Sequence, residues 1–119
     1  RHLDVHAMRE AAGYLVGEHD FKSFCSIHAQ VETTVRRIYA LTVDKKKDII
    51  TIRITGNGFL YNMVRIIAGT LIRVGTGEYK PEQIPEILAA KDREMAGPTA
   101  PAHGLTMIGI EYEDLEEKS

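Results

Sequence analysis

The fold is decided by GNGFLYNMVRIIAGTL, residues 56–71. A glycine-flanked turn opens a segment that is apolar on nearly every face, and such helices are usually buried. We predict one long helix over about residues 59–74, ended by Gly75 and Gly77. The middle of this helix carries a single charged residue, Arg65, which is the first candidate for a functional role.

Arg65 needs an explanation because a guanidinium cannot shed its charge. In a buried helix it requires an anionic partner or a water-lined cavity. The small residues Ala68 and Gly69, one turn further on, allow another segment to pack closely against that face. The alternative is a structural arginine that pairs with Asp92 or Glu94, or that extends its head to solvent.

Local patterns predict the other elements. Asp4 is a plausible N-cap for a helix that runs up to Gly17. Its apolar face would hold Val5, Met8, Ala12, Leu15 and Val16. Residues 19–26 should form a turn anchored by Phe21 and Phe24. A short helix after Pro81 should direct Ile84, Ile87 and Leu88 inward, and residues 91–104 should form an ordered loop.

Alternating apolar and polar residues predict three strands, at 35–44, 49–55 and 105–112. A charged turn over residues 44–48 would join the first two. In the first strand, one face should hold Val35, Arg37, Tyr39, Leu41 and Val43. In the second, one face should hold Ile50, Ile52 and Ile54.

The order α-β-β-α-α-β is most of a ferredoxin-like split βαβ fold. We therefore expect an α+β sandwich, an antiparallel sheet with helices on one face, whose first strand would precede Arg1. That strand is central in this topology, so its loss should leave a gap or an open edge. The 119 residues are expected to form a single domain, with an acidic tail at 114–119.

The composition, 44% hydrophobic and 27% charged, is that of an ordinary globular protein. The longest apolar run is broken before the roughly 18 residues of a membrane span. One cysteine cannot form an internal disulfide, which favours a reducing cytoplasm. The net charge is −2, but residues 111–119 hold five acids, and the rest carries 14 basic against 12 acidic residues. That balance is mildly permissive for RNA.

Four sequence segments, in the same order along the chain, resemble the tRNA pseudouridine synthase A family. FLYNMVRII at 59–67, with GTL at 69–71 and VG at 74–75, is similar to that family's arginine-bearing helix. The others are GEHDFKSF at 17–24, KDR at 91–93 with AGPTAPA at 96–102, and Gly104-Leu105. Together they span most of residues 4–112. Family members carry another half N-terminal to this part, so we expect this chain to be the C-terminal half.

The resemblance implies a cofactor-free isomerisation of uridine to pseudouridine in the anticodon arm of tRNA. An aspartate nucleophile from a Gly-Arg-Thr-Asp-type motif in the other half would attack a flipped-out uridine, letting the base detach, rotate and rejoin through carbon. Arg65 matches the active-site arginine that pairs with this nucleophile, and a guanidinium would keep a carboxylate ionised and oriented. No aspartate here has that context, so the chain alone should be inactive.

Other site residues remain open between two interpretations. Phe59, Met63 and Leu105 line the nucleotide pocket or belong to the core. His28 and Gln30 lie in a segment that aligns with a tRNA contact, or form an ordinary polar loop. Relatives tend to have a basic residue near the end of this segment, where this chain has Glu32, which repels phosphate.

Arg36, Arg37 and Arg53 would form a basic face for the RNA backbone, or serve solubility on an edge strand. We do not expect a metal site. A structural zinc site needs four protein ligands that complete its coordination, and the sequence contains no repeated pair of Cys or His residues. The residues whose types suggest such a site are His19, Asp20, Cys25, His28 and His103.

The leading hypothesis is thus a cytoplasmic, homodimeric tRNA pseudouridine synthase whose partners are tRNA and the N-terminal half. One alternative is a non-catalytic ferredoxin-like RNA-binding module, in which Arg65 grips phosphate. Another is a self-associating regulatory domain that binds a small metabolite between subunits.

Overall fold

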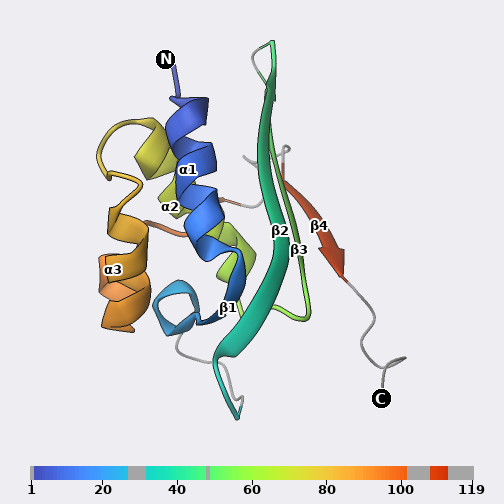
Figure 1. The fold of residues 1–119 in the computed structure, drawn as a ribbon, viewed down its shortest axis with the longest axis vertical. Helices are drawn as coiled ribbons and strands as arrows, with labels where there is room; N and C mark the ends of the chain where they lie inside the picture. Colours follow the sequence, from blue (N-terminus) through green and yellow to red (C-terminus); the bar gives the residue numbers. More distant parts are fainter. Residues whose placement is uncertain (1, 27–31, 48, 102–107, 113–119) are drawn as a thin grey trace.

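The computed structural model describes residues 2–26, 32–47, 49–101 and 108–112, the last range by its backbone only. Three helices lie together on one side of a sheet (Figure 1). They are α1 (Val5–Leu15), α2 (Met63–Gly75) and α3 (Gln83–Ala90). The strands are β1 (Gly17–Asp20), β2 (Val35–Lys46), β3 (Ile49–Gly56) and β4 (Ile108–Tyr112), and single 3₁₀ turns occupy Lys22–Phe24 and Arg93–Met95.

The sheet has the order β1-β2-β3-β4. The first three strands are antiparallel neighbours, which confirms the predicted α+β class with helices on one face. β4 runs parallel to β3, with Ile52 opposite Ile108 and Gly56 opposite Tyr112. A parallel pair needs a crossover connection, and α2 and α3 provide it. β4 therefore lies directly beside β3, and the expected gap is not found between these two strands.

Helix α1 follows its predicted pattern except at one residue. The Asp4 carboxylate accepts a hydrogen bond from the Ala7 amide at 3.0 Å, as an N-cap does. Met8 and Leu15 are fully buried. The prediction that Val16 belongs to the apolar face is wrong. The helix ends at Leu15, and Val16 has an extended backbone and is 39% exposed.

Strand β2 contains a β-bulge that the alternation did not reveal. Ile38 pairs with Gly56 but Ala40 pairs with Thr55, so β2 has one extra residue there. Before the bulge the side chains of odd-numbered residues point outward, and after it they point into the core. The single predicted face over residues 35–43 is therefore wrong: its first three members are exposed, whereas Leu41 and Val43 are buried. β3 alternates as predicted.

Helix α2 begins at Met63, four residues later than predicted. Asn62 has a left-handed backbone, with φ of 62°, which a right-handed helix cannot continue through. Gly58, with φ of 158°, adds a second irregular residue upstream. Residues 57–62 consequently form a loop that leads from β3 into the helix.

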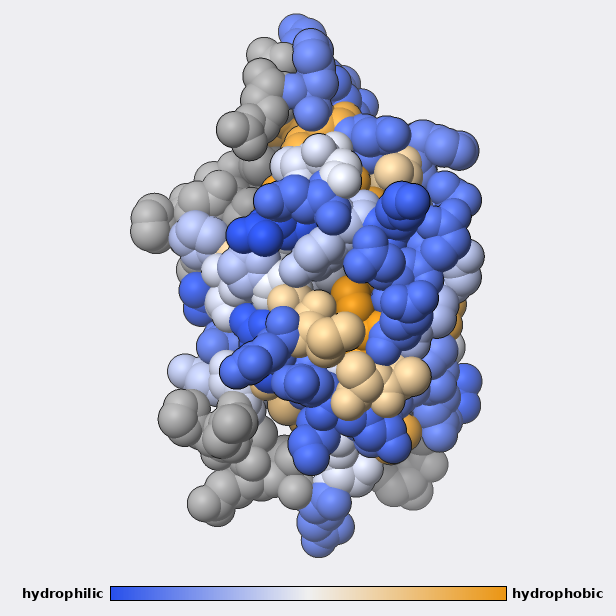
Figure 2. Space-filling model, turned by 90° about the vertical axis from the view of Figure 1, so that its left-hand side faces the viewer, coloured by the Kyte–Doolittle hydropathy of each residue, from blue (hydrophilic) through white to orange (hydrophobic). Residues whose placement is uncertain are grey.

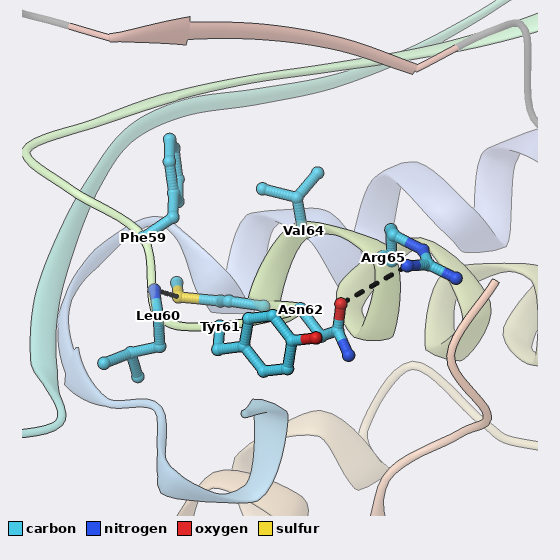
Figure 3. Close-up of a pocket in the computed structure, with 7 residues that line it drawn as sticks. Phe59, Leu60, Tyr61, Asn62, Val64 and Arg65 are labelled. Carbon is cyan, nitrogen blue, oxygen red and sulfur yellow. Dashed lines mark hydrogen bonds between the residues drawn. The ribbon is translucent and has the colours of Figure 1, made fainter. Parts of the chain in front are cut away.

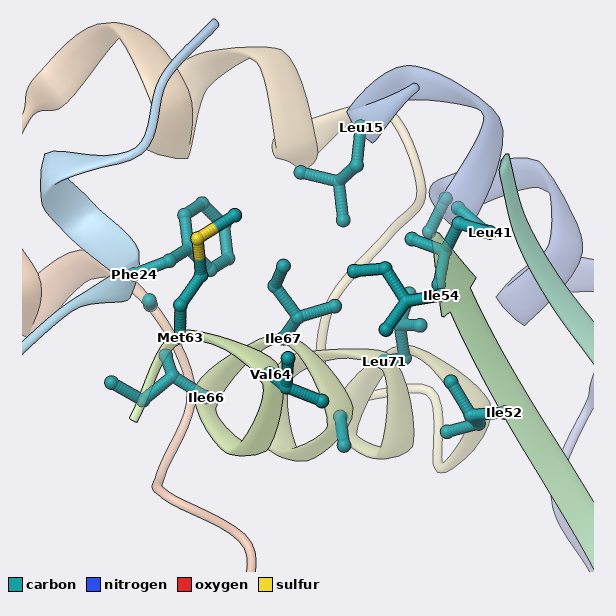
Figure 4. Packing of buried hydrophobic residues seen from close by; sticks show 14 of the residues in the cluster. Leu15, Phe24, Leu41, Ile52, Ile54, Met63, Val64, Ile66, Ile67 and Leu71 are labelled. Atoms are coloured by element: carbon teal, nitrogen blue, oxygen red, sulfur yellow. The ribbon is translucent and has the colours of Figure 1, made fainter. Parts of the chain in front are cut away.

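The core lies between the sheet and α2. Met63, Ile67 and Leu71 point from α2 toward Leu15, Phe24, Leu41, Ile52 and Ile54 (Figure 4). Each large side chain so buried contributes about 1.5–3 kcal/mol. From the helical side, the surface is mostly hydrophilic around a small hydrophobic patch (Figure 2). Within the described ranges, no helix is long and apolar enough to cross a membrane.

Candidate active site

Arg65 is half-buried on the first turns of α2, and neutral oxygens orient its side chain. Its Nε donates to the Ala100 carbonyl at 2.7 Å, and Nη1 donates to Asn62 Oδ1 at 3.3 Å. The Ala100 amide returns a bond to the Arg65 carbonyl at 3.0 Å. A guanidinium has five N–H donors, so these contacts leave capacity for a ligand.

Arg65 forms no ion pair among the residues that the structure describes. The alternative pairing with Asp92 or Glu94 is therefore not what the structure shows. Asp92 instead accepts from the Glu94 amide at 3.0 Å and caps the 3₁₀ turn that follows it. The charge of Arg65 is thus held in place without being neutralised by a described carboxylate.

The guanidinium stands at one end of an open pocket of about 270 Å³. Seven consecutive residues, 59–65, line the pocket (Figure 3). Phe59 and Met63, the two predicted pocket residues within the described part, are both among them. Met63 is also fully buried, so it serves the core and the pocket wall at once. Leu105 lies outside the described residues.

The sequence did not predict four pocket residues, the apolar Leu60 and Val64 and the polar Tyr61 and Asn62. Tyr61 is 58% exposed, and its carbonyl accepts from the Ser26 amide at 3.1 Å. The Asn62 side chain donates to Ser26 Oγ at 3.1 Å while accepting from Arg65. An asparagine just before an apolar run is an N-cap signal and could have placed the helix start. Here, however, its backbone is left-handed and its side chain makes no capping hydrogen bond.

The segment 96–101 packs against α2 and carries the carbonyl that holds Arg65. Its contact requires a glycine: a Cβ on Gly69 would lie 1.8 Å from the Pro98 carbonyl oxygen. Buried Thr70 accepts from the Gly97 amide at 2.9 Å, and Arg93 donates to the Gly97 carbonyl at 2.8 Å. The ordered loop predicted over 91–104 is confirmed as far as residue 101.

The three arginines predicted as one basic face lie on two strands and are divided between the two faces of the sheet. Arg37 is exposed and pairs with Glu18 at 2.7 Å. Arg53 is exposed on β3. Arg36 lies beside the loop into the pocket, with Nε 3.7 Å from where a Cβ on Gly58 would be. Of the three, Arg36 is thus the one whose side chain lies beside the loop that leads into the pocket. His28 and Gln30 lie outside the described residues.

Neither the described aspartates nor Cys25 line the pocket. The four described aspartates, none of which lines the pocket, are Asp4, Asp20, Asp44 and Asp92. Burial raises the pKa of the Cys25 thiol, and the negative charge of Asp20 adds to this. The nearby cations Lys22, Arg36 and Arg93 oppose it. Over the described residues, no three His, Cys, Asp or Glu side chains gather to hold a metal ion.

Comparisons with known proteins agree with one another. A family model described as tRNA pseudouridine synthase matches residues 11–113. The chain is 60% identical over 110 residues to tRNA pseudouridine synthase A of Brevibacillus brevis, covering 92% of this chain and 45% of that protein. The tRNA pseudouridine synthase A of Bacillus pumilus is 54% identical over 112 residues, 94% of this chain and 45% of that protein. The chain therefore spans a little under half the length of these curated relatives.

Proposed function

Because this chain belongs to the tRNA pseudouridine synthase family, we propose that it supplies the arginine-bearing part of an active site that converts uridine to pseudouridine in tRNA. One observation carries the proposal: the Arg65 guanidinium is fixed beside a pocket by two neutral oxygens and has no described carboxylate partner. Such a group is prepared to receive an anion.

The anion is the carboxylate of a nucleophilic aspartate from a part of the protein outside these 119 residues. In the isomerisation, the N1–C1′ glycosidic bond of uridine breaks and a C5–C1′ bond forms, while C5 loses its proton and N1 gains one. A guanidinium favours the ionised form of the carboxylate and fixes its direction of attack. None of the described aspartates lines the pocket, which supports a nucleophile from elsewhere.

The pocket suits one nucleobase. Its volume of about 270 Å³ falls below the roughly 300–1,000 Å³ of sites for drug-sized ligands. Phe59 and Met63 supply apolar walls for a uracil ring, and Leu105 is proposed as a third. Arg36, whose side chain lies near Gly58, would contact RNA phosphate. Arg37 and Arg53 would act from the other face, and His28 and Gln30 from the segment after Ser26.

We extend the proposal to a cytoplasmic homodimer acting on the anticodon arm, as the family resemblance implies. The sheet offers a place for self-association. In the described part, β1 pairs only with Val35–Ile38, which leaves most of β2 as an edge. Arg9 covers part of that edge by donating to the Val43 carbonyl at 2.7 Å. Open strand edges are common sites of pairing with a second chain.

The test compares Arg65→Ala and Arg65→Lys in a protein that includes the upstream half. Tritium release from C5-labelled uridine reports the chemistry in single-turnover reactions at saturating tRNA, and filter binding reports tRNA affinity. Arg65→Ala should abolish turnover while tRNA binding persists, since phosphate contacts elsewhere carry most affinity. Arg65→Lys should also be severely impaired, because an ammonium lacks the planar two-pronged contact.

Arg73→Ala is the matched control, because Arg73 lies on the same helix and pairs with Glu78 at 3.0 Å. It should keep a near-normal chemical rate. If Arg65→Ala retains more than about a tenth of the wild-type rate, a loss of only ~1.4 kcal/mol, the catalytic assignment is wrong. A phosphate-gripping arginine in a non-catalytic module would instead weaken binding first. The 119-residue chain alone should release no tritium.

A further inference from the structure

We propose that Asn62 is a positioning residue that aims the Arg65 guanidinium while leaving its charge available, an inference that rests on the function proposed above. Asn62 occupies the last position before α2, with φ of 62° and ψ of 8°. Glycine adopts this left-handed conformation freely, and asparagine and aspartate adopt it more readily than other residues. The backbone alone therefore does not require an amide at this position.

The side chain explains the choice of residue. Asn62 Oδ1 accepts from Arg65 Nη1 at 3.3 Å (Figure 3). Its Nδ2 donates to Ser26 Oγ at 3.1 Å. The amide orientation follows from chemistry, because a guanidinium can only donate and must face the oxygen. Glycine would make neither contact, and an ionised aspartate would lose the donor to Ser26. An amide satisfies both neighbours at once.

Neutrality is the decisive property of this acceptor. Both oxygens that hold Arg65, from Asn62 and from the Ala100 carbonyl, carry no net charge. They restrict the direction of the guanidinium but do not form an ion pair with it. A carboxylate at position 62 would hold Arg65 at least as firmly, yet it would compete with the nucleophile for the same charge. The two neutral oxygens therefore fix the direction of the guanidinium and leave its charge available to the nucleophile.

The experiment compares Asn62→Gly and Asn62→Asp in the protein with its upstream half, because both substitutions suit the backbone. We expect the single-turnover rate at saturating tRNA to fall about tenfold in Asn62→Gly, or ~1.4 kcal/mol, and at least a hundredfold in Asn62→Asp. The thermal midpoint should follow the opposite order, with Asn62→Asp at or above Asn62→Gly. A purely structural role predicts that rate and stability change together.

Asn57→Asp is the control for added negative charge. Asn57 lies in the same loop, but its Oδ1 accepts from the Arg37 amide at 3.0 Å and does not face Arg65. Its chemical rate should stay within about twofold of wild type. If Asn62→Asp is as fast as Asn62→Gly, or both keep the wild-type rate, the inference is overturned.

A second measurement separates failure of the inference from failure of the proposed function. Nitrogen-15 relaxation of the Arg65 side chain reports how tightly the guanidinium is held, whether or not pseudouridine forms. The order parameter of its Nε–H bond should drop in Asn62→Gly and stay near wild type in Asn62→Asp. An unchanged value in Asn62→Gly contradicts positioning by Asn62. An inactive wild type with the expected relaxation changes would refute only the function.

Discussion

Replacing Gly69 by alanine should separate the segment 96–101 from helix α2. The new Cβ would lie 1.8 Å from the Pro98 carbonyl oxygen, so this backbone must retreat by about 1.7 Å to reach an ordinary contact of roughly 3.5 Å. Such a retreat breaks the reciprocal bonds between Arg65 and Ala100, and the bond from the Gly97 amide to Thr70.

Two neutral hydrogen bonds are worth about 1 kcal/mol each, and one from a charged donor about 1.5–3 kcal/mol. Alanine returns about 0.5–1 kcal/mol because it removes the entropy cost of a helical glycine. The net loss is therefore ~3 kcal/mol. For a chain of this size, at roughly 4 °C per kcal/mol, the thermal midpoint should fall by about 12 °C.

The assay is thermal unfolding followed by circular dichroism, with Gly13→Ala as the matched control. Gly13 is also helical, but a Cβ there meets nothing within 4 Å among the described atoms. Gly13→Ala should stabilise the protein by about 0.5–1 kcal/mol. If Gly69→Ala changes the midpoint by less than 2 °C (under roughly 0.5 kcal/mol), or raises it as Gly13→Ala does, the packing argument is refuted.

Two further predictions concern the N-terminal part of the chain. Asp4→Ala removes the cap on the Ala7 amide and should cost about 1 kcal/mol in urea unfolding, whereas Asp4→Ser should retain most of that stability. Cys25 should react with iodoacetamide at a higher pH in the folded than in the unfolded protein, because burial raises its pKa and only the thiolate reacts. Equal pH midpoints for alkylation in the two states would contradict the latter.

Sequence reasoning succeeded where structure depends on neighbours in the chain. The cap at Asp4 and the alternation of β3 are local, and both were predicted. The bulge in β2 was not, since it appears only in the pairing of Ile38 and Ala40 with β3. Arg65 was predicted as a functional residue because it is the one charged residue in the middle of an apolar helix. Its partner Ala100 lies 35 residues away. Every residue has a backbone carbonyl, so the residue type could not identify this acceptor.

The separation of Arg65 from Ala100 in sequence also has a consequence for local stability. The pocket walls come from one continuous segment, so they form together with the start of α2. The hydrogen bond from Arg65 to the Ala100 carbonyl joins residues 35 positions apart. The segment that carries this carbonyl can therefore open locally, with an equilibrium of its own. Lifting of the segment 96–101 would break the contacts with Ala100 and leave Arg65 held by Asn62 alone, while the pocket stays intact. Hydrogen exchange at the Ala100 amide, which donates to the Arg65 carbonyl, measures the free energy of that opening.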